Sequence, residues 1–243
     1  LILSLKGLTW VAVLSVLCVV IAYSIAADVA RCYLVRWSTL NMISPNVYVD
    51  PTMDQAQRNK LMDLIIEADG RISGLYGSRL SNPVIIAGNT MDVMVDYGGD
   101  IGNQYGRTRI LPFSTYIILG PRGIRDLDVL SHEIAHAEFA ARVGYRYLES
   151  VPSWFDEGLA MQFDERVSET AWYEWTGGRK ELPDLDRLSN IQHDDWLGYA
   201  AAKYIVNRWL AAVGQPGLLN FMDEIRNGAG FDSWLSQYEA EFH

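Results

Sequence analysis

Cysteine is almost absent from this chain of 243 residues, occurring only at Cys18 and Cys32. Two cysteines cannot build the disulfide framework of a small secreted scaffold, and they cannot supply a cysteine-based zinc site. Histidine is also scarce, with four residues in the whole chain. A site built on imidazole groups has few positions to use, so carboxylates are the better supply of further ligands.

Positive charge is in short supply as well, because 20 Lys and Arg residues face 30 Asp and Glu residues, for a net charge of −10. No stretch of clustered Lys and Arg forms a basic patch, so nucleic acid is excluded as the expected partner. Hydrophobic residues make up 49% of the chain and aromatic residues 12%, which excludes an intrinsically disordered protein. The length favours one domain with one substantial core, although two small domains also fit.

Charge is missing altogether from Leu8 to Ala27, a run of twenty residues preceded by Lys6. A helix of about 20 apolar residues spans a bilayer, so we expect a transmembrane anchor within residues 1–27. A cleaved signal peptide is the main alternative, since Lys6 and the small residues of 22–27 fit its two ends, and a buried core helix is another. The expected location is a single-pass membrane protein with its catalytic domain outside the cytoplasm, or a secreted protein if the run is cleaved. We expect a juxtamembrane linker at 28–44 and one domain at 45–243.

The remaining sequence predicts short strands followed by helices. Alternating or continuous apolar residues predict strands at 46–50, 83–87 and 116–119, and helical spacing predicts a helix at 52–76 capped by Thr52. The Gly-, Asn- and Arg-rich segment 97–109 predicts a loop or an irregular hairpin. Further helices are expected at roughly 125–143, 152–164, 196–212, 216–226 and 231–241. This order predicts an α+β domain with a small N-terminal mixed sheet and a helical C-terminal half.

The chemistry of the chain is concentrated in the motif His132-Glu133-Ile134-Ala135-His136. Residues four apart on a helix differ by about 40° around the axis, so both imidazoles can reach one ion. Glu133 lies beside them and can accept a proton from a water on that ion, as the general base of a metallopeptidase does. A catalytic zinc site needs a third protein ligand, and the acidic segment 152–160 can return to the first helix after a chain reversal near Gly144.

The two segments together resemble a known family. The pattern His132-Glu133-x-x-His136 followed by Trp154-x-x-Glu157-Gly158-x-Ala160 is similar to the gluzincin zinc metallopeptidases, above all to the small peptidase MA-like domains, and more distantly to the catalytic domains of aminopeptidase N and thermolysin. The resemblance implies a zincin-like fold, one Zn²⁺ held by His132, His136 and Glu157, and Glu133 as the catalytic base. The chain has no G-x-M-E-N loop, so the resemblance does not extend to aminopeptidase specificity.

Several further residues are candidates for supporting roles, each with a plain structural alternative. Tyr199 opens a helix where this family often places the oxyanion donor, but it is equally a core aromatic. His193 offers the same chemistry, although an exposed loop histidine is the simpler interpretation. Asp128 can orient an imidazole from one turn away or remain solvated. Asp156 adjoins Glu157 but points about 100° away from it on a helix.

The sequence thus predicts a membrane-anchored zinc metallopeptidase that hydrolyses peptides or proteins. The strand Tyr116–Leu119 is a candidate edge for binding an extended substrate, or else an ordinary buried strand. Two alternatives remain open. One is a zinc-binding scaffold or interaction module without catalysis, and the other is an enzyme of the same fold that acts on a substrate other than a peptide.

Overall fold

The computed structural model describes residues 27–100, 102–144, 150–178 and 196–233, together with positions 10, 13 and 15. Within these ranges no helix has both the length and the apolar character that a bilayer crossing requires. The predicted membrane run at 8–27 lies almost wholly outside the described residues. So do His193 and most of the predicted helix at 231–241.

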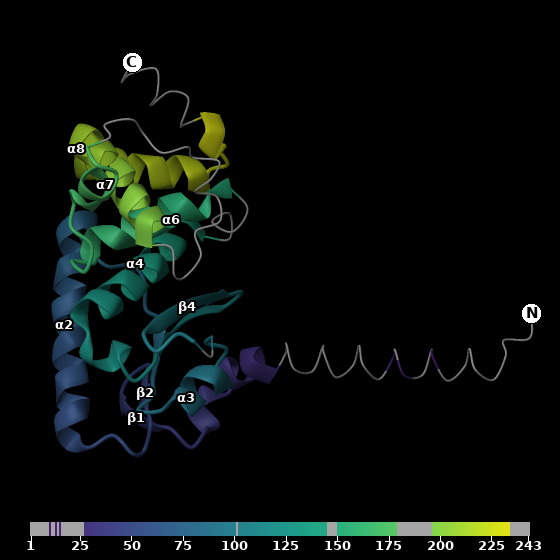
Figure 1. The fold of residues 1–243 in the computed structure, drawn as a ribbon. Helices are drawn as coiled ribbons and strands as arrows, with labels where there is room; N and C mark the ends of the chain where they lie inside the picture. The colour runs from purple at the N-terminus through teal and green to yellow at the C-terminus, as the bar shows by residue number, and fades with distance from the viewer. Residues whose placement is uncertain are drawn as a thin grey trace, which may run out of the picture.

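A five-stranded mixed sheet forms one half of the domain (Figure 1). The strands follow the order β1 (Asn41–Ser44), β2 (Val47–Val49), β3 (Val84–Ala87), β5 (Ser114–Leu119) and β4 (Gly106–Leu111). The three inner strands run parallel, whereas β1 and β4 pair antiparallel with β2 and β5 at the two edges.

This topology corrects two expectations and decides a third that the sequence left open. β1 falls inside 28–44, the segment expected to be a linker, so the sheet begins before residue 45. β4 occupies the end of the segment 97–109, expected to be a loop or irregular hairpin, and extends it to Leu111 as a regular strand. Of the two interpretations left open for Tyr116–Leu119, the buried strand is the one observed, because β5 lies between β3 and β4; β1 and β4 are the edges of the sheet.

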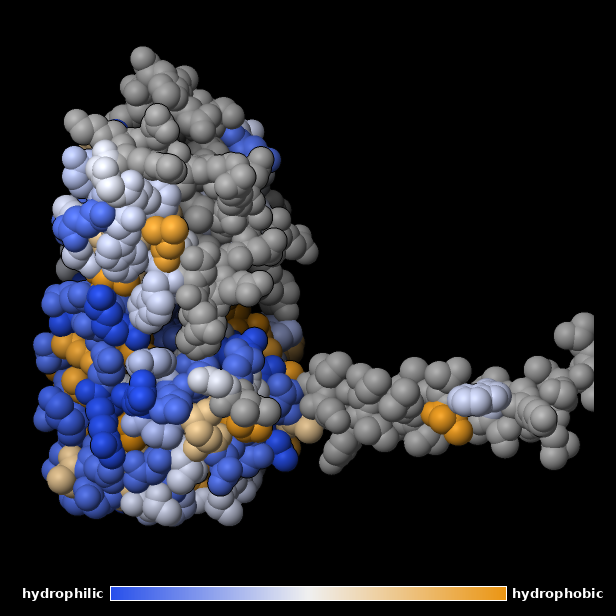
Figure 2. All heavy atoms as spheres, in the orientation of Figure 1, coloured by the Kyte–Doolittle hydropathy of each residue, from blue (hydrophilic) through white to orange (hydrophobic). Residues whose placement is uncertain are grey.

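The long helix α2 (Gln55–Tyr76) runs along one face of the sheet and reaches the helical half (Figure 1). It starts at Asp54 rather than at the expected Thr52, because Asp54 and Gln57 form a reciprocal capping box. Thr52 instead donates its hydroxyl to Asp50. The outer face of α2 is predominantly hydrophilic, as Figure 2 shows, and its buried residues face the sheet and the next helix.

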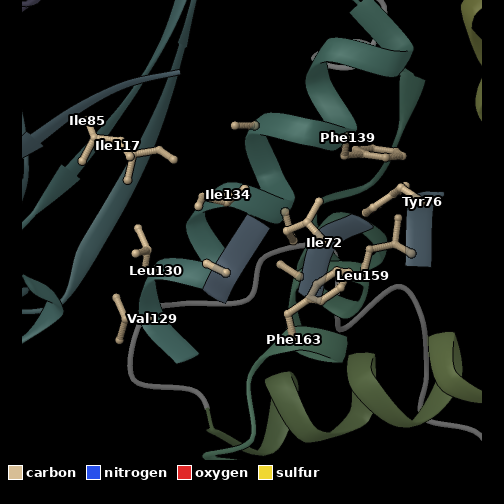
Figure 3. Packing of buried hydrophobic residues seen from close by; sticks show 14 of the residues in the cluster. Ile72, Tyr76, Ile85, Ile117, Val129, Leu130, Ile134, Phe139, Leu159 and Phe163 are labelled. Carbon is tan, nitrogen blue, oxygen red and sulfur yellow. The ribbon is translucent and has the colours of Figure 1, made fainter. Parts of the chain in front are cut away.

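Helix α4 (Leu127–Val143) lies at the centre of the domain and is buried over most of its length. Leu130 and Ile134 pack between Ile117 of the sheet and Ile72 of α2, as Figure 3 shows. This continuous core joins the sheet to the helical half. A helix enclosed on several sides by packed neighbours holds its remaining polar side chains in fixed positions.

The helical half consists of α6 (Ser153–Ala160), η4 (Met161–Phe163), α7 (Ala171–Trp175) and α8 (Trp196–Arg226). α8 is two helices joined at Gly214, whose φ of 63° breaks the helix in the gap between the two helices expected from the sequence. α6 lies flush against α8, because a Cβ on Gly158 would stand 2.5 Å from a methyl carbon of Val206. Gly158 therefore makes room for the close approach of α8.

The other face of the sheet has a thinner cover. It is packed by the helical segment 27–33, η1 (Val35–Trp37) and α3 (Met91–Asp96), and η2 (Gly123–Arg125) leads from the sheet into α4. The buried residues of this second cluster include Cys32, Val35, Tyr48, Ile86 and Ile118.

Candidate metal centre

Helix α4 presents both histidines of the motif to one cavity. Its first turn is capped by Asp126, whose carboxylate accepts hydrogen bonds from the backbone N–H groups of residues 128 and 129. One helical turn separates His132 from His136, and their Nε2 atoms come within 3.0 Å of each other. The cavity that they line has a volume of about 610 Å³.

Helix α6 supplies the third candidate ligand, Glu157, next to the two histidines. The Glu157 Oε2 atom lies 3.2 Å from His132 Nε2 and 3.5 Å from His136 Nε2. Donor atoms around a tetrahedral zinc ion with bonds of 2.0–2.1 Å are about 3.3 Å apart, which matches this triangle. Two imidazole nitrogens and a carboxylate oxygen are also a donor set that suits zinc. The residues present therefore fit the metal that the motif implies.

Asp156 orients one of the two imidazoles. Its Oδ2 atom lies 2.8 Å from Nδ1 of His136, so the hydrogen bond places a proton on Nδ1 and leaves Nε2 free to act as a ligand. The sequence left two roles open for Asp128, orienting an imidazole or remaining solvated. Asp128 pairs with Arg71 of α2 at 2.7 Å instead.

The electrostatics of the triangle favour a cation. Burial alone would lower the pKa of His136, but the carboxylates of Asp156 and Glu157 outweigh burial and hold that pKa well above its usual range. Burial likewise opposes ionisation of Glu157, yet the two imidazoles keep its pKa well below its usual range. The same negative potential would favour a divalent ion between these side chains.

A second acidic group, missed in the sequence, faces His132. The Asp164 carboxylate is fully buried, and its Oδ2 atom lies 3.8 Å from His132 Nδ1. Arg166 donates to both oxygens of Asp164, and these bonds lower its pKa against the effect of burial. The buried Lys203 of α8 donates to the backbone oxygens of Asp164 and Val167, which holds this loop against the cavity.

Glu133 faces the cavity beside the triangle, and edge strand β4 passes over it. The Thr108 hydroxyl donates to Glu133 Oε2 at 2.6 Å. β4 approaches so closely that a Cβ on Gly106 would stand 2.9 Å from Cγ of Glu133. Neither Gly106 nor Thr108 was expected at the site, because the sequence predicted only a loop or an irregular hairpin for this segment.

Tyr199 also reaches the cavity, as one of its lining residues near the start of α8. Its ring centroid is 6.4 Å from that of His132, and it packs against Trp196. Burial, followed by the negative charges of Glu157 and Glu133, raises the pKa of Tyr199 above its usual range. The hydroxyl therefore keeps its proton and remains a hydrogen-bond donor at neutral pH.

The described residues thus bring together His132, Glu133, His136, Glu157 and Tyr199, all of which the sequence singled out. Comparisons of this chain with protein-family models, with curated proteins and with solved structures find no match.

Proposed function

We propose that this protein is a zinc-dependent metallopeptidase of the gluzincin type. The observation that carries the proposal is the convergence of three ligand atoms from α4 and α6 beside an acidic side chain, Glu133, in one cavity. The pattern Trp154-x-x-Glu157-Gly158-x-Ala160 supports the family assignment. Hydrolysis at such a centre requires a base next to the ion, and the position of Glu133 in the wall of the same cavity supports that role.

Zinc bound at the triangle would polarise the scissile carbonyl and lower the pKa of a bound water. Glu133 takes the proton of the attacking water and delivers it to the leaving amine. The Thr108 hydroxyl fixes the direction of the Glu133 carboxylate through its 2.6 Å hydrogen bond. Asp156 fixes the His136 ring, so the ligand nitrogen keeps its position during turnover.

Tyr199 is proposed as the oxyanion donor. Its hydroxyl stays protonated, it comes from a different helix than the base, and it borders the same cavity. A donor aimed at the developing negative oxygen stabilises the transition state more than the substrate.

Strand β4 is the proposed docking edge for the substrate. Its residues Gly106, Thr108 and Ile110 all line the cavity, and in the described sheet no strand pairs with its outer edge. An extended peptide can add to such an edge through main-chain hydrogen bonds, which places its backbone over Glu133. The proposed substrate class is therefore an extended peptide or an unfolded segment of a protein.

The proposal is tested with the full chain, because helix 27–33 and β1 pack on the sheet and belong to the folded unit. The purified protein is mixed with a peptide library in three forms: with zinc, with a chelator, and as zinc-loaded Glu133→Gln. We expect cleavage only in the first. If all three forms cleave equally, the activity does not come from this site.

A zinc-loaded wild-type chain that cleaves nothing would favour the alternative of a zinc-binding scaffold. Hydrolysis of other amides or esters in a parallel screen, lost in the Glu133→Gln chain, would favour an enzyme with a substrate other than a peptide.

A further inference from the structure

The thinly covered face of the sheet carries an apolar surface that the proposed peptidase chemistry does not use. Leu34 is 54% exposed and Trp37 is 63% exposed. Together with Ala27, Ala30 and Arg31 they border a hollow of about 610 Å³. Leu34, Trp37, Arg31 and Arg36 are called the N-terminal patch below. Large apolar side chains exposed side by side at a hollow are a feature of surfaces that bind a partner or a membrane.

The N-terminal patch combines aromatic, aliphatic and cationic groups. The Arg36 guanidinium lies over the Trp37 ring at 3.6 Å from its centroid. Tryptophan prefers the boundary between lipid chains and headgroups, and arginine beside it can bind lipid phosphates. In Figure 2, exposed hydrophobic residues lie among hydrophilic ones on the side of the domain where helix 27–33 begins.

The segment that carries the N-terminal patch packs firmly on the domain. Cys32 and Val35, which alternate with its exposed residues, are buried against the sheet. Arg31 pairs with the half-exposed Asp96 carboxylate at 3.1 Å and donates to the backbone oxygen of the same residue. Asp28 accepts a 2.6 Å hydrogen bond from Arg109, the β4 residue between Thr108 and Ile110. A surface held in this way can seat the whole domain in one orientation.

What covers the N-terminal patch is indicated by the chain that precedes it. The uncharged run Leu8 to Ala27 has the length of a bilayer crossing and ends at Ala27, in the wall of the hollow. If that run is inserted, no linker separates the bilayer from Leu34 and Trp37. A helix of seven residues rises only about 10 Å, so this patch stays within reach of the headgroups.

We propose that the N-terminal patch is a membrane seat, in which Leu34 and Trp37 enter the lipid interface while Arg31 and Arg36 meet the headgroups. The inference depends on the predicted membrane run and not on the proposed peptidase activity. Because Asp28 ties this segment to β4, the seat also holds the cavity in a constant orientation towards the membrane. Substrates would then be presented from segments near the bilayer surface.

The test uses the full chain in phosphatidylcholine vesicles, with Cys18→Ala to remove the cysteine of the apolar run. Cys32 stays, since it is fully buried and burial raises its pKa to about 11. An environment-sensitive fluorophore is attached at Leu34→Cys, and in a matched control at Lys60→Cys on the polar face of α2. Nitroxide-bearing lipids quench from the lipid phase, and iodide quenches from water.

We expect lipid quenching at position 34 to be several-fold stronger than at position 60, and iodide quenching to be several-fold weaker. Adding Trp37→Ser to the Leu34→Cys chain should lower lipid quenching while the chain stays in the vesicle fraction.

Three results would overturn the seat. Position 34 could behave like position 60. It could be shielded from iodide without lipid quenching, which would mean that a second copy or another part of this chain covers the patch. Lipid quenching could also survive Trp37→Ser unchanged, which would mean that nearness to the anchor alone explains it. None of these readouts depends on catalysis.

Discussion

Two buried glutamates on α4 differ in what surrounds them. Glu138 is fully buried, and its carboxylate accepts hydrogen bonds from the backbone N–H groups of Leu80 and Ser81 and from Arg142. Glu133 lies five residues earlier, and its carboxylate has one donor among the described residues, the Thr108 hydroxyl. Beyond it lies the cavity that contains the histidine pair.

Under the proposed function, the same helix carries one structural carboxylate, Glu138, and one catalytic carboxylate, Glu133. A carboxylate whose acceptor sites are filled by donors holds the chain together and has little capacity left for a substrate. A carboxylate with open acceptor sites, next to the three candidate metal ligands, can accept a proton and pass it on. Burial alone does not distinguish the two carboxylates. The hydrogen-bond partners of their oxygens do.

The largest expected effect is the difference in kcat between variants of these two glutamates. Glu133→Gln should lower kcat for peptide hydrolysis by about a thousandfold or more, because general-base assistance is lost, while zinc binding stays unchanged. Glu138→Gln should keep kcat within a fewfold at temperatures where it is folded. Steady-state kinetics and zinc titration on both variants provide the measurement. Equal losses in the two variants would remove the distinction.

For the free energy of unfolding, we expect the opposite order: the substitution at Glu138 should cost more than the one at Glu133. Glu138→Gln replaces a charged acceptor by an amide that cannot satisfy two backbone donors and Arg142, so the free energy of unfolding should fall by about 3 kcal/mol. Glu133→Gln should change it by less than about 1 kcal/mol, since only the Thr108 hydroxyl bonds its side chain. Urea denaturation of the two variants tests this, and a larger loss in Glu133→Gln would contradict it.

Metal affinity should depend on Asp156 and not on Asp128. Asp156→Asn weakens the hydrogen bond that orients His136, so the zinc affinity should fall by about 10- to 100-fold. Asp128→Asn, in the first turn of α4 and paired with Arg71, is the matched control and should leave the affinity unchanged. Competition with a chromophoric chelator measures both. An equal loss in the control variant would assign the effect to general destabilisation.

The smallest effect concerns Cys32, a buried ionisable group remote from the site. Burial raises its pKa to about 11 from 9.0, so the folded state resists ionisation that the unfolded state accepts. Its stabilising contribution is complete below pH 9 and is lost between about pH 9 and 11, amounting to about 2 to 3 kcal/mol. Cys32→Ala should flatten the alkaline fall in stability over that range. An unchanged slope would show that other groups cause the fall.

The sequence could predict the local part of the site. His132, Glu133 and His136 share one helix, so their spacing alone brings them together. Glu157 follows from its resemblance to a known pattern. Thr108 and Asp164 could not be found in this way, because their contacts with α4 depend on how distant segments pack.

Strand β4 shows why some elements escape prediction. Gly106 and Thr108 lie over the cavity, and Arg107 and Arg109, which alternate with them along the strand, pair with acidic residues. Neither face has the apolar alternation by which a half-buried strand is recognised. Its pairing with β5 determines its structure, which is a tertiary effect.

The central claim is that His132, His136 and Glu157 hold one zinc ion. Zinc titration of the metal-free full chain, followed by X-ray absorption spectroscopy, tests it most directly. The account predicts one zinc per chain, with two imidazole nitrogens and carboxylate or water oxygens at about 2.0–2.1 Å and no sulfur ligand. It also predicts an altered coordination shell in Glu157→Gln. Failure to bind zinc stoichiometrically, or a spectrum unaffected by Glu157→Gln, would contradict the account.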